Sequence, residues 1–275
     1  MVLLEVCCTG IESALNMLGE GAHRVELCSV LECGGLTPTW LSRLRDRPSI
    51  APFHDQPSIA PFHDRPSIAP CASPAPPTSE GFSPAADPDS RHIDLLSHAH
   101  VLIRCRPGDF CYSQAELDEM CRSIRLCREI GVKGVVIGAL TPDGDPDLPA
   151  LRKMIHVATG PSATLDSTGP DNTLTLVFHR AFDECRDPFG ALEQIISLGF
   201  HNLLTSGHAP TAEEGIPILK QLVERAAGRI NIMAGKGVTL DNVARIIRET
   251  GVPAVHLSER EGIFKLLRHI QNANS

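Results

Sequence analysis

The sequence predicts a (β/α)8 barrel, and three observations lead to this fold. The 275-residue chain alternates eight short apolar segments with helical patterns. Without a Pro-rich stretch, about 230 residues remain, close to the roughly 250 typical of such barrels. The apolar segments are hydrophobic on both faces, as are parallel strands covered by helices. A doubly wound open sheet is the alternative, but its first turn would be rich in glycine, whereas here it reads CCTG at 7–10.

Each expected element follows from a local pattern. Apolar runs predict strands at 3–6, 25–27, 100–103, 134–137, 173–178, 202–205, 229–233 and 254–257. Helical periodicity predicts helices at 11–18, 37–44, 147–157, 188–197, 211–226, 240–249 and 262–270, and a long one from Ser113. Ser113 and Glu116 have the spacing of a capping box. Pro38 lies in the first turn of the helix expected at 37–44, where proline is favoured.

A Pro-rich segment at 45–92 interrupts this alternation. It contains a nine-residue repeat, RPSIAPFHD at 47–55 and QPSIAPFHD at 56–64, with a third copy beginning at Arg65. Frequent prolines remove amide donors and disfavour helices and central strands. We therefore expect one barrel domain over 1–275, with a disordered low-complexity insertion after its second βα unit. A shorter loop is expected at 160–172.

Composition excludes several classes of function. The 25 basic and 33 acidic residues give a net charge of −8, and an acidic surface repels nucleic-acid backbones. No run approaches the roughly 20 apolar residues of a membrane helix. The N-terminus has no leader pattern, and the ten cysteines form neither a CxxC motif nor a regular disulfide framework. We expect a cytoplasmic protein, and a homo-oligomer is compatible with these features.

Polar side chains follow most of the predicted strands, at the end where barrel enzymes collect their functional groups. Candidates for acid–base chemistry on a small anionic ligand are Glu5, Glu26, Arg104, His179 and Asp183. Both glutamates should face inward, where a carboxylate needs a partner, and Arg104 and His179 are the expected partners. We expect His179 to lie beside a carboxylate at the barrel mouth. A buried structural ion network would explain the same pattern.

The turn Gly235-Lys236-Gly237 follows the seventh predicted strand and leads toward a helix. Such a turn can cradle a phosphate at the helix N-terminus, and barrels often bind phosphate near strands seven and eight. An ordinary tight turn would have the same sequence.

Two cysteines occupy matching positions on neighbouring strands. LEVC at 4–7 and VELC at 25–28 share the pattern apolar-Glu-apolar-Cys. Adjacent strands lie about 4.8 Å apart, so Cys7 and Cys28 could approach each other, and two soft thiolates suit Cu(I). From spacing alone, two buried and inert structural cysteines are the more common explanation of this pattern. Cys8 should face the opposite side. Zinc normally requires four ligands, and no Cys/His set here has that spacing.

Several motifs in the same order resemble the copper homeostasis protein CutC family. They are EVC at 5–7, RVELCS at 24–29, GGLTP at 34–38, RCRPGDFCYS at 104–113, GALTPDG at 138–144, FHRAFD at 178–183, LTSG at 204–207 and GKGVTLDN at 235–242. The resemblance implies a TIM barrel, a role in copper tolerance, and Cu(I) binding by Cys7 and Cys28.

The chain departs from the family pattern at two strand ends. Lys236 stands where the family has the central glycine of GGG, and HLSER at 256–260 stands where it has HCSAR. About fifteen residues follow, so we expect a shortened C-terminus. The predicted function is intracellular copper handling through bound Cu(I). The alternative is a barrel enzyme that acts on a small anionic metabolite.

Overall fold

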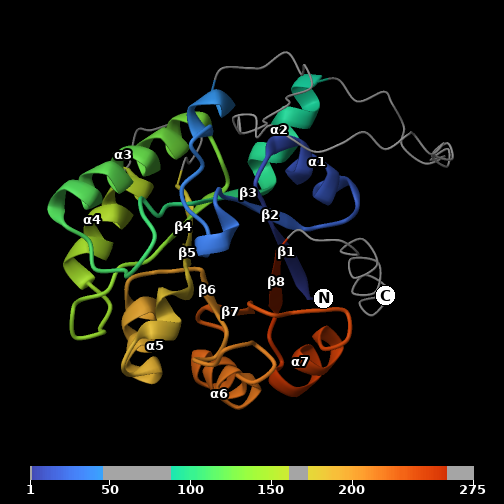
Figure 1. Ribbon diagram of the computed structural model, residues 1–275, viewed down its shortest axis with the longest axis vertical. Coiled ribbons are helices and arrows are strands. Elements are labelled where there is room, and N and C mark those ends of the chain that lie inside the picture. The colour runs from blue at the N-terminus through green and yellow to red at the C-terminus, as the bar shows by residue number, and fades with distance from the viewer. Residues whose placement is uncertain (1, 46–87, 161–172, 259–275) are drawn as a thin grey trace, which may run out of the picture.

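The computed structural model describes residues 2–45, 88–160 and 173–258, which form a closed barrel of eight strands surrounded by helices (Figure 1). Each strand pairs in parallel with its neighbours in the sequence, and β8 closes the barrel against β1. The predicted TIM barrel is therefore confirmed. The predicted helix at 262–270, the loop at 161–172 and residues 46–87 of the insertion lie outside the described residues.

The strands agree with the predicted runs to within two residues at either end. They are β1 Leu3–Cys8, β2 Arg24–Leu27, β3 Ala99–Leu102, β4 Gly134–Ile137, β5 Thr175–Phe178, β6 Asn202–Thr205, β7 Asn231–Ala234 and β8 Ala254–Ser258. Because side chains alternate between the two faces of each strand, this agreement also fixes which residues enter the barrel.

The helices lie outside the strands. They are α1 Ile11–Gly19, α2 Pro88–His98, α3 Gln114–Ile130, α4 Leu148–Thr159, α5 Pro188–Ser197, α6 Ile216–Ala226 and α7 Val243–Thr250. Of these, α3, α4 and α5 begin at residues whose side chains cap them. Before α3, the Ser113 side chain accepts a hydrogen bond from the Glu116 amide, and the Glu116 carboxylate accepts one from the Ser113 amide. The predicted capping box is thus present.

The second βα unit differs from its predicted form. The helix expected at 37–44 is only a short 3₁₀ helix, Leu41–Leu44, and the α-helix of this unit is α2. The insertion therefore interrupts the connection from β2 to α2, and the last residues of the predicted 45–92 segment are helical. The periodicity of α2 is weak because the helix is mostly polar, with Leu95 fully buried and Ile93 67% exposed.

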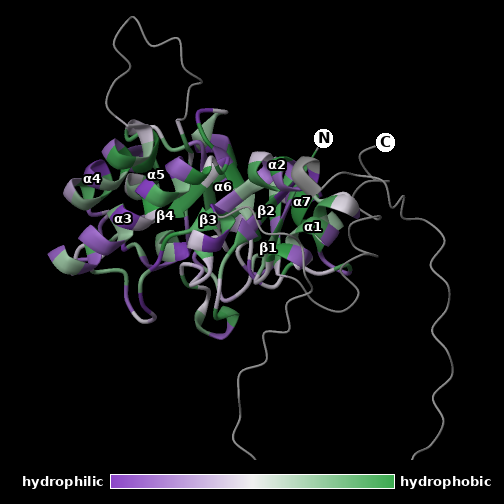
Figure 2. Cartoon of the chain, turned by 90° about the horizontal axis from the view of Figure 1, so that it is seen from above, coloured by the Kyte–Doolittle hydropathy of each residue, from purple (hydrophilic) through white to green (hydrophobic). Residues whose placement is uncertain are grey.

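Alternation along the strands produces two hydrophobic cores. The larger one lies between the strands and the helices and includes Leu4, Val6 and Cys8 of β1. Cys8 faces this outer core, as predicted. Figure 2 shows hydrophobic residues concentrated there and hydrophilic residues on the outer surfaces of the helices. The smaller core fills the barrel interior with Cys7, Cys28, Leu102, Val136, Val177, Leu204, Met233 and Ala254.

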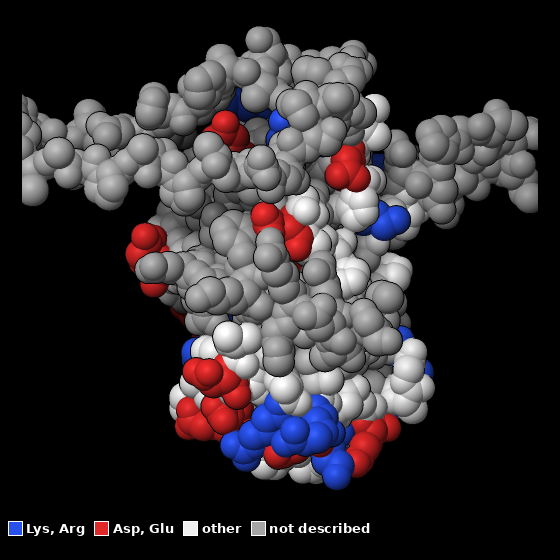
Figure 3. All heavy atoms as spheres, turned by 90° about the vertical axis from the view of Figure 1, so that its right-hand side faces the viewer, with Lys and Arg blue, Asp and Glu red and all other residues white. Residues whose placement is uncertain are grey.

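The described surface carries mixed charge. Figure 3 shows acidic and basic side chains next to one another at the lower end of one face, where α7 lies. Arg245 there pairs with Glu213 at 3.1 Å and with Glu249 at 3.0 Å. Among the described helices, none combines the length and the apolar character that crossing a membrane requires.

None of the eight strands uses residues 46–87. Replacing this segment with a short Gly-Ser linker should therefore change the melting temperature by less than ~2 °C in calorimetry, because loop length has a small effect on stability. A deletion extended to His98 is the control, and it should be strongly destabilising because it removes α2 and the buried Leu95. A large loss of stability in the linker variant would show that the insertion is part of the folded domain.

Candidate metal and ligand site

The centre of the barrel contains a buried carboxylate held by three basic side chains. The strand register aligns Glu5 with Arg24 on β2 and with His256 on β8. Arg24 Nε donates a hydrogen bond to Glu5 Oε2, and His256 Nδ1 lies 2.8 Å from Glu5 Oε1. His100 Nδ1 from β3 lies 3.4 Å from Glu5 Oε2. Three neighbouring strands are thereby linked to β1 through one side chain.

This network determines how its members ionise. Burial of the Glu5 carboxyl opposes its ionisation, but Arg24, His100 and His256 hold the pKa of Glu5 well below its usual range. Burial lowers the pKa of His100 despite its contact with Glu5. The network therefore contains a carboxylate and a guanidinium as its permanent charges, deep inside the barrel.

The two predicted cysteines meet toward the carboxyl ends of β1 and β2. Cys7 is opposite Glu26, and the Cys28 amide donates to the Cys8 carbonyl at 3.1 Å, so the pairing continues one residue beyond β2. The Sγ atoms of Cys7 and Cys28 lie 3.0 Å apart, and both residues are buried free thiols. The hydrogen bond with Cys28 and burial together raise the pKa of Cys7 well above its usual value.

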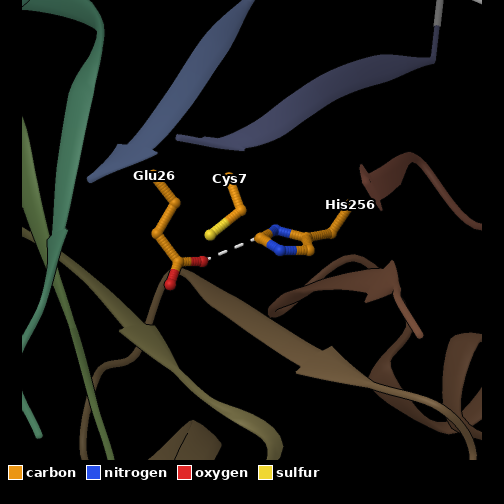
Figure 4. Close-up of side chains that lie close together, drawn as sticks. All are labelled: Cys7, Glu26 and His256. Atoms are coloured by element: carbon orange, nitrogen blue, oxygen red, sulfur yellow. Dashed lines mark ion pairs between the residues drawn. The ribbon is translucent and has the colours of Figure 1, made fainter. Parts of the chain in front are cut away.

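A carboxylate and an imidazole lie beside Cys7. Its sulfur atom points between the Glu26 carboxylate from β2 and the His256 ring from β8 (Figure 4). One potential ligand atom from each of these three residues lies within 4.8 Å of the others. Burial raises the pKa of Glu26 to about 7. Although burial opposes protonation of His256, Glu26 and Glu5 raise the pKa of this imidazole above its usual value.

A cavity of about 340 Å³ opens next to these groups at the carboxyl ends of the strands. Cys7, Glu26 and His256 line it, whereas the cationic groups on its wall are Arg104, Arg180 and Lys236. Glu184 also lines it, so the cavity combines metal-binding side chains with a wall of three cationic groups and one further carboxylate.

The most informative comparison is with a protein-family model. The model of the CutC family matches residues 2–56 and 89–261 of the chain. The chain belongs to the CutC family. The unmatched residues 57–88 contain most of the second copy of the repeat and the whole of the third, so the insertion is an addition to the family's barrel.

Relatives from several bacteria are similar over most of their length. The CutC family protein of Bacteroides fragilis is 38% identical over 261 residues, which cover 95% of this chain and 81% of the relative. The CutC family protein of Vibrio campbellii is 39% identical over 255 residues, covering 93% and 81%.

Solved structures support the same assignment. A crystal structure of CutC from Streptococcus agalactiae, described as a candidate copper homeostasis protein, is 27% identical and has a TM-score of 0.68, covering 94% of this chain and 98% of that one. The phosphoribosylanthranilate isomerase of Pyrococcus furiosus, at 10% identity and a TM-score of 0.51 over 99% and 100% of the two chains, shares the fold alone.

Arg104, within one of the CutC motifs, does not pair with the inward-facing glutamates as expected. Its guanidinium donates to the carbonyls of Cys33, Gly35 and Gly108 at 2.7–3.3 Å and lies 4.8 Å from the centre of the Phe110 ring. The prediction was wrong because β3 aligns His100 with Glu26. Arg104 therefore lies four residues farther along the strand direction, at the cavity mouth.

His179 faces inward at the cavity, but the expectation of a neighbouring carboxylate was wrong. Its Nδ1 accepts a hydrogen bond from the Ala181 amide at 3.1 Å, and its ring lies 5.0 Å from that of Phe110. Within the described part of the chain, His179 Nε2 has no hydrogen-bond partner. Burial, reinforced by the Arg104 charge, lowers the pKa of His179 to about 3, so the imidazole is neutral. Gly138 permits this position, because a Cβ there would lie 2.5 Å from His179 Cε1.

Asp183 is a structural residue in this fold. Its carboxylate accepts hydrogen bonds from the Ser206 amide and hydroxyl and from the Thr205 hydroxyl, and it pairs with Arg180. It does not line the cavity. Asp183 therefore stabilises the turn after β6 through its hydrogen bonds, and it lies away from the cavity where acid–base chemistry is proposed.

The turn after β7 has two residues at the cavity and one packed against the barrel interior. Lys236 and Gly237 line the cavity, with φ of 76° and 71°. Gly235 lies beneath them, where a Cβ would come within 2.6 Å of Leu204 Cδ1 and 3.3 Å of His256 Cβ. Gly235 thus allows β8 to bring His256 close, and Lys236 places a cation on the cavity wall.

Sequence reasoning omitted Arg24, His100 and His256 from the candidate site. The link of His256 to Glu5 depends on the closure of β8 against β1. One feature of the sequence indicates that Glu5 and His256 pair. Glu5 and His256 are each the third residue of their strands, and parallel strands aligned from their first residues pair these two positions.

Removing the charge of Glu5 should destabilise the protein. Glu5→Gln leaves the Arg24 guanidinium buried without its counter-charge, which typically costs about 3–5 kcal/mol of unfolding free energy. Because the pKa of Glu5 is lower in the folded state, its stabilising contribution is fully present above about pH 5 and is lost as the pH falls. Urea unfolding between pH 3 and pH 7 should show a weaker acid dependence in Glu5→Gln than in the wild type. Equal stability at pH 7 would contradict the central role of this carboxylate.

Proposed function

We propose that this CutC family member binds Cu(I) between Cys7 and Cys28 in intracellular copper handling. The observation that carries the proposal is the 3.0 Å separation of two buried thiol sulfurs. Cu(I) prefers soft sulfur ligands and accepts a low coordination number. The similarity to the S. agalactiae protein supports the link to copper.

The surroundings of the pair suit entry of the ion. Cys7 lines the cavity, which leaves room for its side chain to rotate and admit an ion between the sulfurs. Thiols must lose their protons when they bind a metal. Glu26 lies next to Cys7 and has a pKa of about 7, so its carboxylate can accept the proton that Cys7 releases.

The state of the other cysteines supports a reducing compartment such as the cytoplasm. All nine cysteines that the structure describes are free thiols. Structural disulfides are characteristic of secreted proteins, whereas free thiols persist where cellular reductants are present.

Both thiols should be required for copper binding. In an anaerobic Cu(I) titration against a chromophoric chelator, Cys7→Ser and Cys28→Ser should each weaken binding by at least ~100-fold, because two linked ligands bind as a unit. Cys8→Ser is the matched control, since Cys8 faces the outer core. Wild-type affinity in both single variants of the pair would refute the shared site.

The cavity also supports a second candidate function, a barrel enzyme that acts on a small anionic metabolite. Arg104, Arg180 and Lys236 line its wall and would attract an anion. Glu26, with a pKa of about 7, is suited to proton transfer at neutral pH. Lys236 and Gly237 contribute to the part of the wall where barrels often bind phosphate.

Anion binding can be tested through stability. Millimolar inorganic phosphate or glycerol phosphate should raise the melting temperature of the wild type, because a ligand of the folded state stabilises it. Lys236→Gln should lose most of this shift. Lys153→Gln is the control, because Lys153 lies on α4 and pairs with Asp118 at 2.6 Å. An equal shift in all three proteins, or no shift in the wild type, would contradict an anion site at Lys236.

A further inference from the structure

We propose that Cys7, Glu26 and His256 form a second metal-binding set, which takes a divalent transition-metal ion of the Zn(II) class. This inference deepens the proposed function, with which it shares Cys7, but it does not require Cys28. The two proposals can therefore fail separately.

The geometry brings together three different donor atoms. A thiol sulfur, a carboxylate oxygen and an imidazole nitrogen from β1, β2 and β8 lie within 4.8 Å of one another. The Glu26 residue is only 4% exposed, and its Oε2 atom makes no hydrogen bond to any described residue, although it forms an ion pair with His256 Nδ1 at 3.5 Å (Figure 4). A buried carboxylate oxygen without a hydrogen bond is costly, and a bound cation would satisfy it.

The imidazole is oriented for a metal by the carboxylate behind it. His256 Nδ1 lies 2.8 Å from Glu5 Oε1 and 3.5 Å from Glu26 Oε2. In the metal-bound form, Nδ1 would donate its proton to Glu5, and Nε2 would bind the ion. Metal-binding histidines usually have such a carboxylate on the other ring nitrogen. Glu5 is itself fixed by Arg24 and His100, so the ring is held rigidly before any ion arrives.

The chemistry of the set favours a divalent ion over Cu(I). Zn(II) binds sulfur, imidazole nitrogen and carboxylate oxygen, and three protein ligands with an open fourth position are a common arrangement. A thiolate and a carboxylate together supply two negative charges to such an ion. All three residues line the cavity, so solvent or a small ligand can reach the remaining position.

No regular Cys/His spacing marks this set in the sequence, because its donors are separated by as many as 249 residues and meet only in the closed barrel. One of the three donors is a carboxylate, which a zinc motif of Cys and His does not contain.

Cobalt(II) is a suitable probe, because it occupies zinc sites and gives a charge-transfer absorption band when a thiolate binds it. The full-length apoprotein, reduced and anaerobic, should bind one equivalent of Co(II) with this band, and Zn(II) should abolish it. Histidines elsewhere on the surface do not contribute to the band.

Variants separate the two metal sets. Glu26→Gln and His256→Gln should each weaken Co(II) and Zn(II) binding at least tenfold. His256→Gln should keep Cu(I) binding, and Glu26→Gln should weaken it by less than tenfold, because it removes a proton acceptor and no copper ligand. Cys28→Ser should lose Cu(I) binding and keep the cobalt band, and Cys7→Ser should lose both. The exposed His156 on α4 provides the control His156→Gln, which should behave as the wild type.

Three results would overturn the inference. They are the absence of a cobalt band in the wild type, a band unchanged in both Glu26→Gln and His256→Gln, and loss of the band in Cys28→Ser. The last result would assign divalent ions to the cysteine pair instead. Circular dichroism and urea unfolding show whether Glu26→Gln and His256→Gln are folded. Glu26→Gln, which keeps the side-chain shape, suffices if His256→Gln is unstable.

Discussion

The Glu5 carboxylate is the constraint on which the rest of the site depends. It is fully buried, and such a charge is tolerated inside a protein only with close partners. Arg24, His100 and His256 supply them from three strands. The same contacts fix the His256 ring beside Cys7 and Glu26. An interaction needed to offset the cost of burial thus also preorganises the metal-binding side chains.

Cys7 belongs to both proposed donor sets, and this sharing has a chemical consequence. Cu(I) at the cysteine pair and a divalent ion beside Glu26 and His256 would compete for one sulfur atom. Besides Cys7, the softer Cu(I) would be bound by the thiol of Cys28, and the harder divalent ion by the carboxylate of Glu26 and the imidazole of His256. The relative concentrations of the two free metal ions would then determine which ion occupies the site.

The sequence was sufficient to predict the barrel, most of its elements and the approach of two cysteines, because these follow from alternation along strands and from the order of units. It was insufficient for partners that depend on register around the closed barrel. The predicted pairing of Arg104 with the glutamates assumes that the polar residues of all strands lie at the same height along the barrel axis. In the structure, His100 of β3 is level with Glu26, and Arg104 lies four residues beyond it. Asp183 was misassigned because its hydrogen bonds come from the end of β6 and the turn after it. The helix α2 was missed because its polar sequence gives little periodicity.

Barrel closure also sets when the site can exist. Glu5 and His256 are 251 residues apart in the chain, yet they lie on neighbouring strands. During synthesis the N-terminal strand leaves the ribosome long before its final partner. Cys7 can meet Cys28 early, but the environment that includes His256 is complete only when β8 has docked. A divalent ion could therefore bind this set only after the barrel has closed. The metal could not guide the early stages of folding.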